Sequence, residues 1–174
     1  SPAPALGPSP ASSPTPAGNR EPEDLGARCE RMAREIGLAD TKDQTALRLQ
    51  LLRLCHRRHQ PVLLEQVARD LKASEHSLEA AYCLADAEAS TQDCQEAHSE
   101  LARMGKREDH WGTLARARLE LEVSLSQEGA RAQVVALERA LDSAPAPHLA
   151  RLLRQVLARV SVYWGPEKDA AITL

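Results

Sequence analysis

The chain has 174 residues, of which 43% are hydrophobic and 27% are charged, with a formal net charge of −3. A chain of this length can bury about 70% of the surface that it exposes when unfolded, which is enough for one domain. The slight acidic excess and the few aromatic residues (two Trp, two Tyr and no Phe) argue against a nucleic-acid-binding surface. No apolar run reaches the roughly 18 residues of a transmembrane helix, so no membrane span is expected.

The N-terminal segment, residues 1–21, is rich in proline, alanine and serine. Six of the 11 prolines of the chain lie here, at Pro2, Pro4, Pro8, Pro10, Pro14 and Pro16. Such a segment cannot bury enough apolar surface to offset the entropy lost on ordering. We therefore predict a disordered linker that ends where the composition changes, at Glu21–Asp24.

From residue 22 onward, apolar residues recur three or four positions apart, as on one face of an α-helix. This pattern predicts eight helices, which begin near Leu25, Thr41, Pro61, Ser74, Ser90 or Thr91, Asp109, Gly129 and Pro147. Hydroxyl and carboxylate side chains at several of these starts can accept hydrogen bonds from a first helical turn, and proline is tolerated at the first position. No segment alternates polar and apolar residues as a strand does, so no sheet is expected.

Short loops join the predicted helices, so neighbours along the chain should pack antiparallel as helical hairpins. The predicted fold is therefore all-α, either hairpins stacked as a short α-solenoid or a compact multi-helix bundle. The predicted helix from Asp109 to Ser126 carries two apolar stripes and should be covered on both sides. The helical domain is expected to span residues 22–164, and residues 165–174 to form the start of a truncated further helix or a tail.

Residues 111–145 resemble a tetratricopeptide-type helical repeat. The residues that carry the resemblance are Trp111, Leu114 and Ala115 in the first helix, and Leu137, Ala140, Leu141 and Pro145 in the second. Arg118 stands where the repeat prefers Tyr, and the segment between the two halves is longer than in the repeat. The resemblance implies an α-helical solenoid that binds other proteins.

The chain lacks the local signatures of phosphate-binding loops, zinc proteases and serine hydrolases. Cys55 and His59 lie one helical turn apart and could share a metal, but no second Cys/His pair stands at ligand spacing. We interpret His56 and His59, with the arginines between them, as the basic C-terminal end of a helix. No catalytic residue, cofactor or metal is therefore expected, and we predict that the protein is not an enzyme.

The predicted function is a non-catalytic helical interaction or scaffold module, part of a larger chain and of a multi-subunit assembly. Its partner would be another protein or peptide. Aromatic and arginine side chains dominate many interfaces, so the candidate anchors are Tyr163 and Trp164 at the end of the last helix. Arg151, Arg154 and Arg159 on the same helix could bind an acidic partner segment.

Two alternatives remain open from the sequence. One is a self-associating structural bundle, in which the leucine-rich stripes at residues 47–54 and 149–160 pair between copies. The other is a helical regulatory arm of a larger enzyme. The cysteines, Cys29, Cys55, Cys83 and Cys94, lie far apart on predicted apolar faces, which is typical of buried thiols in a reducing compartment. Together with the lack of a secretory leader, they predict a cytoplasmic or nuclear location.

Overall fold

The computed structural model describes residues 24–123 and 125–164, and within these residues it contains eight α-helices and no strand. The helices are α1 (Leu25–Leu38), α2 (Thr41–Arg57), α3 (Pro61–Asp70), α4 (Ser77–Ala89), α5 (Gln95–Gly105), α6 (His110–Val123), α7 (Gln127–Asp142) and α8 (Pro147–Tyr163). The all-α prediction is confirmed. The predicted linker at residues 1–21 and the predicted tail at residues 165–174 lie outside the described residues.

Several helices begin where the sequence predicts them. The Asp109 side chain accepts a hydrogen bond from the Gly112 amide (3.0 Å) and so satisfies an otherwise free donor at the start of α6. Ser126 does the same for Gly129 (3.0 Å) at the start of α7. Pro61 stands in the first turn of α3, where a missing amide hydrogen costs no helical bond.

Two predicted helix starts are wrong, and the cause is the same in both. Ser74 donates its hydroxyl to the Leu71 carbonyl (2.7 Å) at the end of α3, and α4 begins only at Ser77. Thr91 likewise donates to the Glu88 carbonyl (2.8 Å) at the end of α4, and α5 begins at Gln95. These hydroxyls close the preceding helix instead of capping the next one, because they hydrogen-bond locally to free carbonyl groups.

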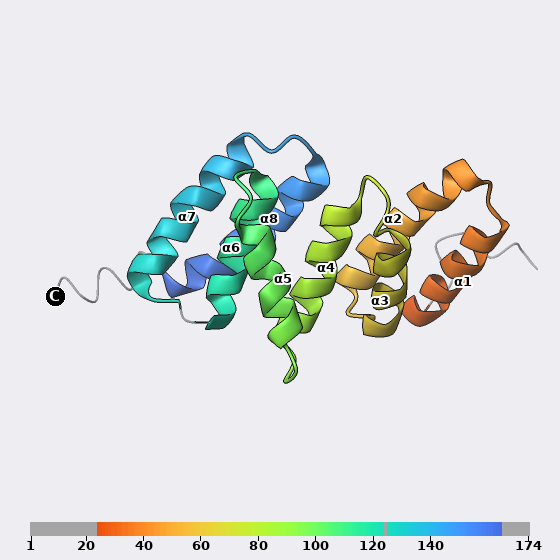
Figure 1. The fold of residues 1–174 in the computed structure, drawn as a ribbon, viewed down its shortest axis with the longest axis horizontal. Helices are drawn as coiled ribbons and strands as arrows, with labels where there is room; N and C mark the ends of the chain where they lie inside the picture. The colour runs from red at the N-terminus through yellow and green to blue at the C-terminus, as the bar shows by residue number, and fades with distance from the viewer. Residues whose placement is uncertain (1–23, 124, 165–174) are drawn as a thin grey trace, which may run out of the picture.

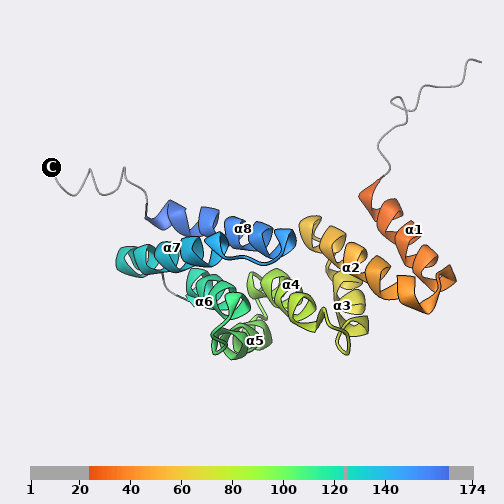
Figure 2. The same ribbon diagram turned by 90° about the horizontal axis from the view of Figure 1, so that it is seen from above.

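The helices form an elongated stack of antiparallel hairpins (Figures 1 and 2). Each helix packs on its neighbours along the chain, and α2, α4, α6 and α8 also pack on one another in succession. We call these four helices the inner layer and the odd-numbered helices the outer layer. Because α1 packs closely only on α2, the arrangement is a stack and not a bundle around one centre.

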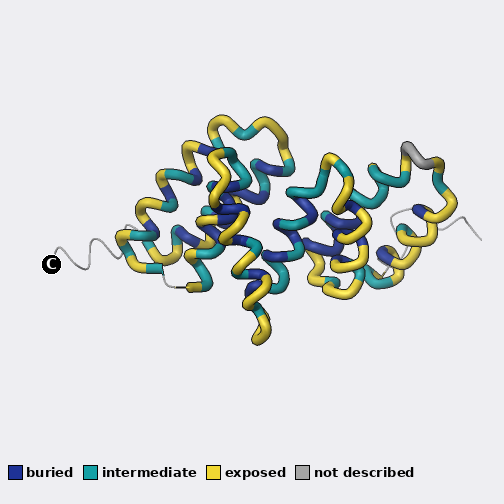
Figure 3. Tube along the Cα trace, viewed as in Figure 1, coloured by how far each residue is buried: buried dark blue, intermediate teal, exposed yellow. Residues whose placement is uncertain are grey.

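The core follows the middle of the stack, and exposed residues line the loops and the outer sides of the helices (Figure 3). Helix α6 packs on α4, α5, α7 and α8, and Leu114, Ala115 and Ala117 on it are fully buried. This confirms the prediction that the helix is covered on both sides. In the described residues, no helix combines the length and apolar character needed to cross a membrane.

The turn between α5 and α6 allows only glycine at position 112. A Cβ atom at Gly112 would lie 1.9 Å from the backbone oxygen of Arg107, far inside the van der Waals distance. The missing side chain lets the start of α6 rest directly against the preceding turn. A larger side chain at this position would force the start of α6 away from the turn.

Candidate functional site

One pocket of about 620 Å³ draws side chains from all four inner-layer helices. Its lining residues are His56, Arg57, His59, Tyr82, Asp86, Ala87, Ser90, Arg118, Gln155, Val156, Ala158 and Arg159. A second hollow of about 600 Å³, between α3, α4 and α5, has a floor of alanines and a rim of charged side chains. Buried polar groups converge only in the first of these two pockets, which is therefore the better candidate for a binding site.

The pocket is built around Asp86 on α4. Nε2 of His56 on α2 lies 2.6 Å from one carboxylate oxygen of Asp86, and Nε of Arg118 on α6 donates to the other. Arg118 also donates to the backbone oxygen of Asp86 (3.2 Å) and to Oγ of Ser90 (3.1 Å). Its remaining nitrogen donates to the Glu122 carboxylate at 2.5 Å. Arg118 is fully buried, so these bonds supply the hydrogen-bond partners that a desolvated guanidinium needs.

The ion pairs of this network set the charges of its members. Burial alone would raise the pKa of Asp86, but the hydrogen bonds from His56 and Arg118 outweigh it and lower that pKa. Burial alone would lower the pKa of Arg118, but Asp86 and Glu122 outweigh it and raise that pKa. Both groups are therefore charged at neutral pH, and the network ties α2, α4 and α6 together.

A second polar network lies about two turns earlier on α4, around Glu79. Arg53 on α2 donates two hydrogen bonds to the Glu79 carboxylate, at 2.8 and 3.1 Å, in the bidentate geometry that suits a guanidinium. Nε2 of His148 on α8 lies 2.6 Å from the same carboxylate. Burial opposes the charge of Glu79, yet His148 and Arg53 together lower its pKa to about 2. We call the pocket and this adjoining network the inner groove.

The inner groove holds more positive than negative charge. Its arginines are Arg53, Arg57, Arg118, Arg151 and Arg159, and its carboxylates are Glu79, Asp86 and Glu122. Arg53 and Arg118 make the close bonds to these carboxylates. Arg159 on α8 reaches Asp86 and Glu122 only at 3.9 and 3.8 Å.

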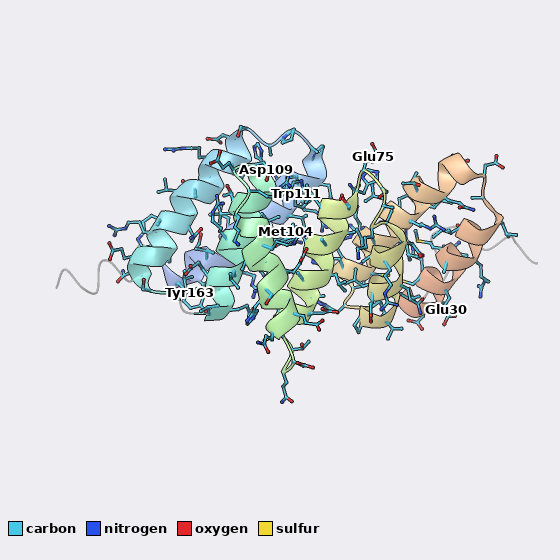
Figure 4. All side chains as sticks on the ribbon, viewed as in Figure 1. Glu30, Glu75, Met104, Asp109, Trp111 and Tyr163 are labelled. Carbon is cyan, nitrogen blue, oxygen red and sulfur yellow. The ribbon has the colours of Figure 1, made fainter. Side chains whose placement is uncertain are left out.

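The predicted anchor residues do not form one cluster: Tyr163 and Trp164 lie at the C-terminal end of α8, and Arg159 lies in the pocket lining. Tyr163 lies at the C-terminal end of α8 and is 44% exposed (Figure 4). The adjacent Trp164 is partly buried, with the guanidinium of Arg131 5.5 Å from its ring centroid. Arg154 is exposed, whereas Arg159 lines the pocket. These predictions of partner contacts remain untested.

Arg151 is less exposed than Arg154 and Arg159, the other two candidate arginines of α8. It is only partly exposed, and its Nη2 atom is buried without a hydrogen-bond partner among the described residues. Burial and the neighbouring charges of Arg57 and Arg53 lower the pKa of Arg151. The side chain therefore lies beside the Glu79 network, between α2 and α8.

The cysteine and histidine at the end of α2 point to different surroundings. Cys55 is fully buried against Cys29 of α1, and burial raises the pKa of its thiol to about 12. His56, the next residue, instead pairs with Asp86 in the groove. Among the described residues, no cluster of three or more His, Cys, Asp or Glu side chains is arranged to bind a metal ion. All four cysteines carry free thiols.

Sequence reasoning missed the residues at the centre of the groove: Arg118, Asp86 and Glu79. One signal was available for Arg118, which is a charged residue between the two apolar stripes of a helix predicted to be covered on both sides. Glu79 and Asp86 are seven residues apart and so share one face of α4, but nothing local identifies their partners on α2, α6 and α8.

Comparison with known proteins assigns no family to this chain, because no family, curated protein or solved structure matches it. The function must therefore be inferred from the site itself.

Proposed function

We propose that the protein is a non-catalytic interaction module whose inner groove binds a segment of another protein. The observation that carries this proposal is the convergence of side chains from α2, α4, α6 and α8 on one pocket. Stacked hairpins create continuous surfaces of this kind, and their exposed side chains can vary without disturbing the packing. The tetratricopeptide resemblance, which is a prediction from the sequence, implies the same type of function.

The chemistry of the groove supports binding more than catalysis. A nucleophile and its general base must lie within hydrogen-bond reach of each other, yet the Ser90 hydroxyl donates to Glu122 (3.3 Å) and Nδ1 of His56 has no hydrogen-bond partner among the described residues. Cys83 lies on α4, but it is fully buried and burial raises the pKa of its thiol. The polar groups therefore hold the helices in place, and the groove offers a shaped, charged surface.

The alternative of a self-associating bundle receives less support. The leucines that suggested it are largely covered by the chain's own helices, since Leu51, Leu52, Leu54, Leu149, Leu152 and Leu153 are all buried. The stripes at residues 47–54 and 149–160 thus supply internal packing. Sedimentation of the full chain tests the alternative, which requires a stable oligomer at micromolar concentration.

Site-specific photo-crosslinking in cells tests the proposal. A photoreactive amino acid replaces Ala158, which is exposed in the pocket, and in a matched variant it replaces Ala132, which is exposed on the outer helix α7. We expect a defined protein adduct from position 158 and a weaker one or none from position 132. Adducts formed only from position 132, or from neither position, would contradict binding in the inner groove.

A further inference from the structure

We infer that the inner groove binds an acidic protein segment, whose Asp or Glu carboxylates lie between Arg57 on α2 and Arg151 and Arg159 on α8. This inference rests on the proposed function and adds the chemistry of the partner. It starts from the charge balance of the groove, where three arginines remain after the internal carboxylates have made their close bonds.

The internal bonds leave these three arginines available. Glu79 is occupied by Arg53 and His148, and the carboxylates of Asp86 and Glu122 are occupied by Arg118. Neither Arg57 nor Arg151 forms an ion pair with any described residue, and Arg159 has only the two long contacts given above. An incoming carboxylate would thus gain charge-assisted bonds without breaking a close internal pair.

Arg151 gives the most specific indication of an anionic ligand. A buried guanidinium nitrogen without an acceptor costs free energy, and two further arginines nearby add electrostatic repulsion. The fold therefore keeps a positive charge where it destabilises the free protein. A carboxylate placed between Arg57 and Arg151 would supply the missing acceptor and reduce the repulsion.

The arrangement of the inner layer leaves room for such a segment. Helices α2 and α8 contribute side chains to the same pocket without packing closely on each other, and both reach Glu79 of α4 with their side chains. Residues Arg53 and His56 meet α4 at Glu79 and Asp86, and on the other side His148 and Arg159 meet the same two carboxylates. The groove therefore runs along α4, with a row of basic side chains on each side.

Charge complementarity favours an acidic protein segment over nucleic acid as the occupant. The whole chain carries a net charge of −3, so its field does not attract a polyanion over a long range. Tyr82 is the one aromatic residue in the pocket lining, and at 1% exposure it offers no face for base stacking. A short run of carboxylates needs only the local excess of arginine.

Binding of model peptides to the full chain tests the inference. Fluorescence anisotropy is measured with a labelled peptide of alternating Glu and Ala, with its Gln counterpart, and with an oligouridylate RNA. The groove variants are Arg57→Gln, Arg151→Gln and Arg159→Gln, and the matched control is Arg139→Gln, which removes an exposed arginine from the outer helix α7. Unfolding by urea, measured on every variant, separates binding from folding.

We expect the Glu peptide to bind more tightly than the Gln peptide, and each groove substitution to weaken it about fivefold. Arg139→Gln should leave the affinity unchanged. Arg151→Gln should also leave the stability unchanged or raise it, which a purely structural arginine would not do. Equal binding of both peptides, equal effects of groove and control variants, or tighter binding of the RNA would overturn the inference. If crosslinks from position 158 persist in that case, the proposed function stands and only the acidic partner is rejected.

Discussion

Arg118 is the residue whose removal tests the polar core of the inner layer most severely. Arg118→Met keeps the unbranched stem of the side chain and deletes the guanidinium. The substitution removes donors to Asp86, Ser90 and Glu122 while leaving both carboxylates about four-fifths buried. The cost therefore comes from desolvated anions that lose their main counter-charge.

The expected magnitude follows from the bonds that remain. Breaking a buried ion pair by deleting one partner costs about 3–5 kcal/mol. Asp86 keeps its 2.6 Å contact with His56, and Glu122 is 20% exposed, so water can solvate part of its charge. We therefore predict that Arg118→Met lowers the free energy of unfolding by about 3 kcal/mol, near the lower end of that range.

Urea unfolding followed by circular dichroism measures this change. The matched control is Arg103→Met on the outer helix α5, which breaks an exposed pair with Glu100 and should cost less than about 1 kcal/mol. Adding Asp86→Asn and Glu122→Gln to Arg118→Met should recover part of the loss, because the orphaned charges are then removed. A loss below about 1 kcal/mol for Arg118→Met would show that these ion pairs do not hold the inner layer together.

Three further predictions concern backbone and charge. Gly112→Ala should destabilise the protein by about 2 kcal/mol or more, because its Cβ would overlap the Arg107 carbonyl. Gly37→Ala should stabilise it by about 0.5 kcal/mol, because Gly37 lies in α1 with open space around it and alanine favours the helix. Urea unfolding of both variants checks the contrast. The pKa of Glu79 is about 2 in the folded chain and 4.5 ordinarily, so its ionised form stabilises the fold by up to about 3 kcal/mol above pH 4.5, and this contribution is lost as the pH falls towards 2. In Glu79→Gln the free energy of unfolding should therefore depend less on pH over that interval. An unchanged pH profile would refute the pairing. His59 has a φ of 53°, which strains any residue that carries a Cβ atom. His59→Gly should therefore raise the free energy of unfolding by about 1 kcal/mol and the thermal midpoint with it, while His59→Ala should raise neither. Equal thermal midpoints for the two variants would count against strain at this helix end.

The sequence predicts the helices well because each must bury an apolar face. The position of α6 inside the stack was predictable for the same reason, since its two apolar stripes require cover on both sides. The starts of α4 and α5 were not predictable, because Ser74 and Thr91 can bond equally well to the helix before them.

The inner groove could be predicted only in part. Arg159 was a candidate for partner binding from its place on the last helix, and the structure puts it in the pocket lining. The pairing of Arg118 with Asp86, 32 residues earlier, depends on how successive hairpins stack. That information is distributed over the apolar faces of several helices, so no local pattern around either residue contains it.

Nuclear magnetic resonance of the arginine Nε–Hε groups, recorded while the Glu–Ala peptide is titrated into the full chain, tests the account most directly. It separates arginines that hold the fold from those that bind the partner. We predict that the signals of Arg151, Arg159 and Arg57 shift progressively, while those of Arg118 and Arg53 stay in place because the internal carboxylates already occupy them. Shifts confined to arginines of the outer layer, or displacement of the Arg118 signal without change at Arg151 and Arg159, would contradict the account.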